Sequence, residues 1–340
     1  MSLEKRYVVV TDHIEANTGK DVSDALQALI LENPNRTLYF PDGEYVLAKP
    51  ILTPANPQNS VSLELSAYAV LRASDDWTDT EAMVRLGAAE PFNNITLPGS
   101  NYYFTGGVID GNGRANGISI DSGRETCIHH VSIKNTRIGI HIKWGVNNRS
   151  SDADVHHVNI SGNNAADSIG VLMEGHDNTL TNMRIAGCHK GVCAHSGGNI
   201  LRDIHPLYIY DGENETVENF LTSVAFESEG NDNYFDVCYS DQFCTAFSIG
   251  DGYKDIIDKS YIMWYHPCGK EVAYEARGVF HSIITKPSVN FLEGTENILL
   301  SVAREGGTGM IEYPIVNNEN LMSDDSYKEY LVGKLLSRNH

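Results

Sequence analysis

Short apolar segments recur through the middle of the chain, and they are of two kinds. The first kind has apolar residues at offsets 0, 3 and 5 and begins at Ile128, Val155 and Leu180, with a partial copy at Leu201. These starts are 27, 25 and 21 residues apart. The second kind opens with glycine and then alternates apolar with variable residues; its copies occupy residues 117–121, 139–143, 170–174 and 191–195. Alternation with a period of two is typical of a strand with one buried face.

A matched pair of strands that recurs every twenty-odd residues predicts a stack of similar coils. Each coil buries its apolar face only against its neighbours, which is the organisation of a parallel β-solenoid. Glycine and asparagine between the segments suit the tight bends that such coils need. A β-sandwich is the alternative fold, but its strands do not usually repeat as a matched pair at this interval.

The two ends of the chain differ from the repeating middle. Helical spacing of apolar residues predicts a helix over Asp21–Glu32, with Asp21 capping its start. Residues 37–40 and 44–47 are predicted as strands, and Ser326–Leu336 as a short amphipathic helix.

These elements predict one all-β domain over residues 1–320. Its N-terminal cap covers residues 1–50, its coils cover about 60–310, and a helical tail follows at 321–340.

Two segments near the N-terminus resemble a known superfamily. The sequence Asp21-Val-Ser-Asp-Ala-Leu-Gln-Ala-Leu, followed by Thr37-Leu-Tyr-Phe-Pro-Asp-Gly-Glu-Tyr, is similar to the start of pectate-lyase-superfamily right-handed parallel β-helix proteins, and Ile109-Asp-Gly-Asn-Gly looks like their early coils. That superfamily includes polygalacturonase-like glycosidases, polysaccharide lyases, epimerases and phage tailspike enzymes. The resemblance covers roughly residues 10–300.

The resemblance implies a right-handed single-stranded parallel β-helix, a poly- or oligosaccharide partner, a secreted or cell-surface location and a possible homotrimer. It transfers no catalytic residue. The Asn-Thr-Asp, Gly-His-Gly and Arg-Ile-Lys motifs of polygalacturonases and the Arg-x-Pro-x-x-Arg pattern of calcium pectate lyases are absent from the sequence. Site residues therefore have to come from the strand pattern.

If the glycine-led segments stack in register, about 4.8 Å apart, their outward residues form two columns. The inward residues are all apolar, and a one-residue slip would bury Lys143 and Glu174, which fixes the register. The inward set is Ile118, Ile120, Ile140, Ile142, Val171, Met173, Val192 and Ala194. The first outward column is Ser119, His141, Leu172 and Cys193, and the second is Asp121, Lys143, Glu174 and His195.

The second column carries the candidate catalytic groups. Asp121 and Glu174 would lie about 9–10 Å apart, near the upper end of the separation of an inverting glycosidase's two carboxyl groups. Lys143 between them would favour an ionised carboxylate, and His195 would tune Glu174 or bind substrate. This arrangement favours a glycoside hydrolase with no cofactor.

Two alternatives use the same residues. In a polysaccharide lyase or glycan transferase, Lys143 or His195 would remove the proton beside a uronate carboxylate, with Ca²⁺ as a possible aid. In a non-catalytic carbohydrate-binding or tailspike-like adhesion protein, the column would be a solvated charge ladder that favours strand register.

Further polar residues are candidates for substrate binding. Asp152 and Asp154 lie in a longer turn, where an acid pair or a calcium site is conceivable. Past residue 195 the register has two solutions: either Tyr208 and Tyr210 line the groove, or they lie in a loop and Glu227 stands beside His195 in the second column. The complete substrate-binding set is His141, Asp152, Asp154, Tyr208, Tyr210 and Glu227.

The doublets His129-His130 and His156-His157 recur at the same repeat position. One histidine of each doublet is expected to face outward, and two stacked imidazoles are able to bind a metal ion. Because the sequence offers no third ligand beside them, no metal site is predicted.

Composition and charge narrow the list of partners. The 340 residues carry 25 basic and 45 acidic side chains, a formal net charge of −20, so no electrostatic attraction to nucleic acid or anionic membranes is expected. The negative charge would also repel a polyuronate substrate, unless a local cationic strip such as Lys143 and His195 attracts it. No apolar run is long enough for a membrane helix, and residues 1–10 do not fit a signal peptide. The six cysteines have no zinc-like spacing and are expected as buried or turn thiols.

Overall fold

The computed structural model describes residues 7–89, 102–210, 217–317, 328–333 and 336–337. Its contacts divide the chain into two compact units, Met1–Asn163 with Gly170–Thr179, and Asn164–Ile169 with Leu180–His340. The sequence prediction of a single domain over residues 1–320 stays a prediction.

The elements follow the repeat pattern of the sequence. Those whose residues fall mainly in the first unit are β1 (Tyr7–Val9), α1 (Ser23–Glu32), β2 (Arg36–Phe40), β3 (Gly43–Leu47), β4 (Ile51–Pro54), β5 (Val61–Leu65), β6 (Ala69–Ala73), β7 (Ala82–Ala89), β8 (Tyr103–Thr105), β9 (Val108–Asp110), β10 (Asn116–Ile120), β11 (Ser122–Arg124), β12 (Cys127–His129), β13 (Ser132–Thr136), β14 (Ile138–Ile142), β15 (Arg149–Ser151), β16 (Asp154–Gly162) and β17 (Ile169–Met173). Those of the second unit are β18 (Thr179–Ala186), β19 (Lys190–Ala194), β20 (Ile200–Leu207), α2 (Val217–Leu221), β21 (Val224–Ser228), β22 (Tyr234–Asp236), β23 (Tyr239–Asp241), β24 (Thr245–Ile249), β25 (Ile256–Asp258), β26 (Tyr261–Met263), β27 (Lys270–Val279), β28 (Ile283–Thr285), β29 (Ser288–Asn290), β30 (Glu296–Arg304), β31 (Met310–Glu312), β32 (Ile315–Val316), β33 (Leu331–Val332) and β34 (Leu336–Ser337).

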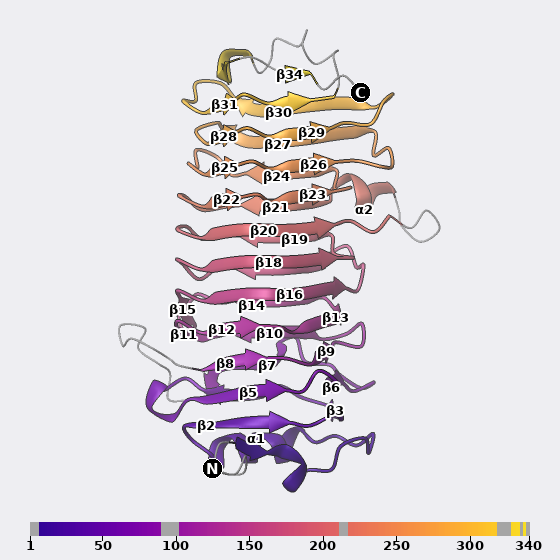
Figure 1. Cartoon of the computed structure of the whole chain (residues 1–340), viewed down its shortest axis with the longest axis vertical. Coiled ribbons are helices and arrows are strands. Elements are labelled where there is room, and N and C mark those ends of the chain that lie inside the picture. Colours follow the sequence, from indigo (N-terminus) through magenta and orange to yellow (C-terminus); the bar gives the residue numbers. More distant parts are fainter. Residues whose placement is uncertain (1–6, 90–101, 211–216, 318–327, 334–335, 338–340) are drawn as a thin grey trace. The chain divides into compact units, whose positions relative to one another are not determined.

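Strands of successive coils pair in parallel, three strands to a coil. In the second unit the three series are β20-β22-β25-β28-β31, β20-β23-β26-β29-β32 and β19-β21-β24-β27-β30. Figure 1 shows β22, β25 and β28 on successive coils of that unit. In the first unit β4, β7, β10 and β14 pair in the same way. The chain is a right-handed parallel β-helix, as the repeats and the resemblance predicted.

The predicted inward face is confirmed. Ile118 pairs with Ile140 and Ile120 with Ile142, and all eight predicted inward residues are buried. The recurring glycines have a steric reason: a Cβ on Gly139 would lie 2.6 Å from the Gly170 carbonyl oxygen. Five of the six cysteines are buried, and all six are free thiols.

The N-terminal helix lies beside an edge strand. α1 begins at Ser23, two residues later than predicted, and the Asp21 carboxylate accepts the Ser23 amide at 2.9 Å. Leu26, Leu29 and Ile30 are buried, and the Gln27 side chain exchanges two hydrogen bonds with the backbone of Leu52 on β4. These bonds satisfy backbone groups that an uncovered edge strand would expose.

The predicted C-terminal helix over Ser326–Leu336 is wrong in its described part. Lys328–Tyr330 is one 3₁₀ turn, and β33 then pairs in parallel with β31. Pairing with the open edge of the preceding coil satisfies the backbone there, and it outweighs a helical pattern only about three turns long. Residues 326–327 and 334–335 lie outside the described residues. Within the described residues, no helix is both long enough and apolar enough to cross a bilayer.

Candidate active site

The predicted outward columns exist in the first unit, but they are not an open face. Ser119 pairs with His141, and the Lys143 amide bonds to the Ile120 carbonyl, which places Lys143 beside Asp121. The Glu174 amide bonds to the Ile142 carbonyl and extends the second column. Ser119 and Asp121 have no exposed surface, and Lys143 is 7% exposed. The solvated charge ladder expected of a non-catalytic protein is therefore absent at Asp121 and Lys143.

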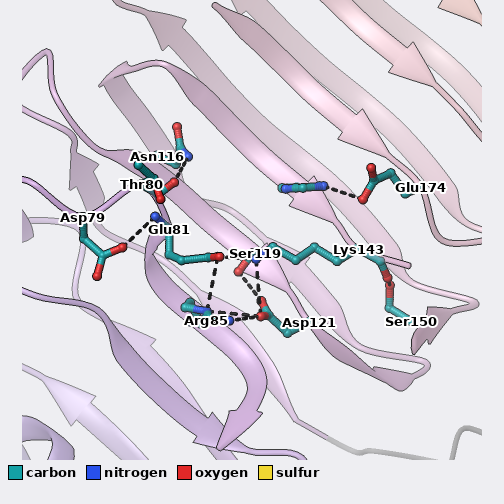
Figure 2. Close-up of polar contacts among 11 residues, drawn as sticks. Asp79, Thr80, Glu81, Arg85, Asn116, Ser119, Asp121, Lys143, Ser150 and Glu174 are labelled. Atoms are coloured by element: carbon teal, nitrogen blue, oxygen red, sulfur yellow. Dashed lines mark hydrogen bonds and ion pairs between the residues drawn. The ribbon is translucent and has the colours of Figure 1, made fainter. Parts of the chain in front are cut away.

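Asp121 is the buried centre of a cluster of four charged side chains, of which Arg85 and Glu81 are partly exposed. Its carboxylate accepts hydrogen bonds from Ser119 and from the Arg85 Nε at 3.1 Å, and the Lys143 Nζ lies 3.5 Å away. Glu81 contacts Lys143 directly and lies 3.6 Å from Arg85. Figure 2 shows Glu81, Arg85, Lys143 and Asp121 pointing toward one another. Two cations and two carboxylates thus balance one another, as a buried charge requires.

A cavity of about 290 Å³ opens beside this cluster. We call it the Lys143 cavity, and it is lined by Thr80, Glu81, Ala82, Asn116, Ser119, Arg137, Ile138, His141 and Lys143. A second cavity of about 150 Å³ shares Thr80, Asn116 and Arg137 with it and adds Trp77, Thr78, Asp79 and Arg114. The two cavities together bring an indole ring, three cations and several hydrogen-bonding groups to one surface.

His141 has an oriented imidazole at this cavity. Its Nε2 lies 2.9 Å from the Glu174 carboxylate. A carboxylate only accepts hydrogen bonds, so Nε2 carries the proton and Nδ1 has the lone pair. Burial, reinforced by the charge of Lys143, lowers the pKa of His141 below its ordinary value, although Glu174 opposes the shift. The imidazole is therefore neutral at neutral pH and able to accept a proton.

His195 and Glu227 meet in a second cluster, in the second unit. β21 pairs with β19 so that Glu227 stands beside Cys193, and Glu229 continues the column of His195. The register solution that puts Glu227 in the column of His195 is wrong, because Glu227 pairs with Cys193, two residues before His195. The side chains still meet: His195 Nε2 lies 2.8 Å from one Glu227 oxygen and Lys190 Nζ 2.6 Å from the other.

These contacts make Glu227 a permanent anion. Burial alone would raise its pKa, but the hydrogen bonds from His195 and Lys190 lower it to about 2. Such a group is suited to hold cations or hydroxyl groups and is poorly suited to donate a proton.

The aromatic and acidic candidates lie elsewhere. Tyr208 follows β20 in a loop and is buried against Phe220 and Phe243, so it does not line a groove. Tyr210 is 37% exposed and packs against Phe220. The register solution that places these tyrosines in a loop is confirmed for the tyrosines but not for Glu227.

Asp152 and Asp154 have partners of their own. Asp152 pairs with Arg124 at 2.9 Å and Asp154 with His156 at 3.1 Å. Neither lines the Lys143 cavity.

Sequence reasoning missed Glu81, Arg85 and Arg137. Arg85 was predictable from the sequence, because Val84-Arg85-Leu86 shows the same apolar alternation as the later segments. In the structure it pairs with Ser119 across β7 and β10. Arg137 stands directly before β14. Glu81 gives no periodic signal, since it precedes β7, and only the fold places it against Lys143.

Comparisons with known proteins are informative at the level of structure. No protein-family model and no curated protein sequence matches the chain. The tailspike protein of Escherichia coli bacteriophage HK620, solved with a pentasaccharide, is similar over 93% of this chain and 67% of its own, with a TM-score of 0.61 and 12% identity. The alginate lyase of Paenibacillus sp. matches over 84% of this chain and 97% of its own, with a TM-score of 0.59 and 14% identity.

An adhesin gives a third match of the same quality. The Streptococcus pneumoniae surface protein and adhesin PfbA is similar over 97% of this chain and 96% of its own, with a TM-score of 0.61 and 12% identity. The chain spans only 62% of a matching protein from Geobacillus virus E2. At these identities the likeness shows the fold alone: this chain has the parallel β-helix architecture of tailspikes, a polysaccharide lyase and an adhesin.

Proposed function

We propose that this chain binds an acidic oligo- or polysaccharide at the Lys143 cavity and cleaves it by β-elimination. The observation that carries the proposal is the neutral, carboxylate-oriented His141 at a cavity that is also lined by Lys143 and Arg137. A base beside two cations is what removal of a proton next to a carboxylate requires. This choice reverses the order of hydrolase and lyase that the sequence favoured.

The reaction needs three groups of the cavity, and Lys143 acts twice in it. His141 takes the proton from the carbon next to the sugar carboxylate, and Arg137 and Lys143 stabilise the negative charge that develops on that carboxylate. The electron pair forms a carbon–carbon double bond and breaks the bond to the glycosidic oxygen. The leaving oxygen takes a proton from the Lys143 ammonium, which lines the cavity and contacts Glu81.

Hydrolysis by the pair Asp121 and Glu174 has less support. Asp121 has no exposed surface and is already hydrogen-bonded by Ser119 and Arg85, so it is poorly placed to touch a glycosidic oxygen. Glu174 is engaged with His141. Glu81 is the carboxylate that lines the cavity, and it contacts Lys143. A hydrolase would need a second carboxyl group free to exchange a proton.

Calcium does not fit this cavity. The ion takes six to eight oxygen ligands, whereas the carboxylates of Glu81 and Asp121 are bonded to the cations Lys143 and Arg85. In this proposal Arg137 and Lys143 supply the positive charge that a calcium ion would otherwise provide. The same two cations attract an acidic substrate locally, although the chain as a whole has a net charge of −20.

A glycan panel tests the proposal. Alginates, pectins, glycosaminoglycans and neutral polysaccharides are incubated with the purified chain, and both reducing ends and the ultraviolet absorbance of unsaturated sugars are followed. We expect both signals on an acidic glycan, and a loss of at least about 100-fold in rate for His141→Asn. His13→Asn, which removes an exposed histidine far from the cavity in sequence, serves as the control.

Two outcomes would contradict the proposal. Reducing ends without unsaturated product would indicate hydrolysis. Binding without turnover on any glycan would indicate a carbohydrate-binding or adhesion protein, which is the function that the adhesin match would favour.

A further inference from the structure

The histidine doublets form a compact array on the first unit. Across the parallel pair β12 and β16, Cys127 pairs with Asp154 and His129 with His156. The rings of His129 and His156 are parallel, with centroids 5.1 Å apart, and those of His130 and His157 are parallel at 4.9 Å. We call these four residues the histidine array. It lies on a different sheet of the coil from the strands that carry Ser119 and His141.

Both histidines of each doublet face outward, which corrects the expectation of one. His130 and His157 have φ angles of 56° and 54°, so each sits at a left-handed bend. The bend inserts one extra residue between the inward residues Ile128 and Val131, and that residue has no room inside the coil. His129 and His156 are half-buried, while His130 and His157 are exposed.

The array contains the third ligand that the sequence did not reveal. Ligand atoms of His129, His130 and His156 all lie within 4.8 Å of one another. The Nδ1 atoms of His129 and His130 are 2.9 Å apart. A second, overlapping group of Cys127, Asp154 and His156 meets the same limit.

One contact already orients a ligand. The Asp154 carboxylate lies 3.1 Å from His156 Nδ1 and accepts a hydrogen bond from its N–H, so the lone pair of His156 is on Nε2. A carboxylate that fixes the tautomer of a metal-binding histidine is the usual outer partner of zinc ligands. The Thr105 hydroxyl stands 3.0 Å from His129 Nδ1 and restricts the rotation of that ring without fixing its tautomer, because a hydroxyl both donates and accepts.

We propose that the histidine array binds one Zn²⁺ ion through His129, His130 and His156, with Asp154 as the orienting carboxylate. Imidazole nitrogens bind Zn²⁺ at about 2.0–2.1 Å in a tetrahedral arrangement. Three nitrogens within 4.8 Å have to move inward, and the exposed His130 ring, which stands at 85° to His129, has room to rotate. Water or a fourth side chain completes the shell.

The ion would join two coils. His129 and His130 belong to one coil and His156 to the next, so the metal bridges neighbouring rungs of the stack. A ligand that binds only the folded chain stabilises it by mass action. The role of this site is therefore structural, and it stands independently of the proposed glycan chemistry.

Zinc titration of the chelator-treated full chain tests the proposal. We expect one equivalent of Zn²⁺ in isothermal titration calorimetry, and a melting temperature that rises with zinc concentration. His130→Asn removes one ligand and keeps a residue that tolerates the left-handed bend, so this variant is expected to fold and to lose at least about 100-fold in affinity. Asp154→Asn should lose about 10- to 100-fold.

Controls separate the array from other sites. His13→Ala and His281→Ala remove histidines elsewhere and should bind zinc as the original chain does. Loss of binding in Cys127→Ser with normal binding in His130→Asn would assign the metal to the overlapping Cys127 group and overturn the proposal. Equal binding by the original chain and by the double variant His129→Ala/His156→Ala, or no binding at all, would also overturn it.

Discussion

Single residues in the left-handed conformation set the shape of each coil. His130, Asp203 and Val237 stand at equivalent bends with φ between 51° and 56°. The sequence shows this bend as an offset of three, in place of two, between the first two apolar residues of the repeat. Asparagine and aspartate tolerate such angles, whereas a β-branched residue is strained there.

Val237 should therefore be replaceable with a gain in stability. It is exposed and has a φ of 53°. We expect Val237→Asn to raise the free energy of unfolding by about 1 kcal/mol, since the left-handed angle costs a branched residue 1–2 kcal/mol. Denaturant unfolding measures the change. Val146→Asn is the control, because Val146 is exposed without a positive φ; an equal gain there would contradict the explanation.

Asp121 illustrates where residue-scale prediction fails. Its outward direction followed from the alternation, but its burial depends on Arg85 and Glu81, which come from another coil. Asp121→Asn should lower the free energy of unfolding by about 3 kcal/mol, because the buried Lys143 and the partly exposed Arg85 lose an anionic partner. Chemical denaturation tests this value, with the exposed Asp24→Asn as control. A fully stable Asp121→Asn chain would count against the buried cluster.

At the scale of elements, close stacking of the coils depends on glycine. Gly139 occupies a strand position where a Cβ would meet both the Gly170 carbonyl and the Ile160 side chain within 2.8 Å. In the sequence, this requirement appears as the glycine that begins each segment of the second kind. Its cause, the approach of the next backbone, becomes visible only in the stack.

Gly139→Ala is expected to destabilise the chain by about 2 kcal/mol through overpacking. Gly145→Ala is the matched control, since a Cβ at Gly145 meets nothing within 4 Å and its φ is not positive. Thermal unfolding of both variants decides: equal melting temperatures would show that the coils have room to separate.

A second element-scale feature is a buried ladder of polar side chains in the second unit. Each backbone N–H donates to a side-chain oxygen of the next coil. The backbone N–H of Asn199 donates to the Asn233 side chain, that of Asn233 to the Asp255 carboxylate, and that of Asp255 to the Ser282 hydroxyl. Asp255 is the acidic member of this ladder, and one of its oxygens has no hydrogen-bond partner. Burial raises the pKa of Asp255 to about 6.

This shift predicts a pH dependence with a definite sign. The folded chain holds the Asp255 proton more tightly than the unfolded chain, so stability falls as the pH rises from about 4 through 6. Asp255→Asn has no carboxyl group to ionise. Its free energy of unfolding, relative to that of the original chain, should therefore rise by about 2–3 kcal/mol as the pH goes from 4 to 7. Urea unfolding across this range measures the gain, and the exposed Asp76→Asn should show none. A constant difference across the range would contradict the explanation.

At the scale of the whole molecule, the sequence predicts the coil fold well and the site poorly. Periodicity reports which way Ile118 or Ile140 points, because a strand exposes its two faces to different surroundings. It does not report which coil lies beside Glu81, how deeply Asp121 is covered, or that Glu227 pairs with Cys193. These facts depend on contacts between segments far apart in the chain. Because of them, the proposed catalytic group is His141 and no longer a pair of carboxylates.

The masses of the reaction products test the central claim most directly. When a defined acidic oligosaccharide is cut by β-elimination, the masses of the two fragments add up to that of the substrate, because no water enters. We predict this result for the original chain and for His13→Asn, and its loss in His141→Asn. Fragments whose masses sum to the substrate plus one water would show hydrolysis, and they would contradict the account of the Lys143 cavity.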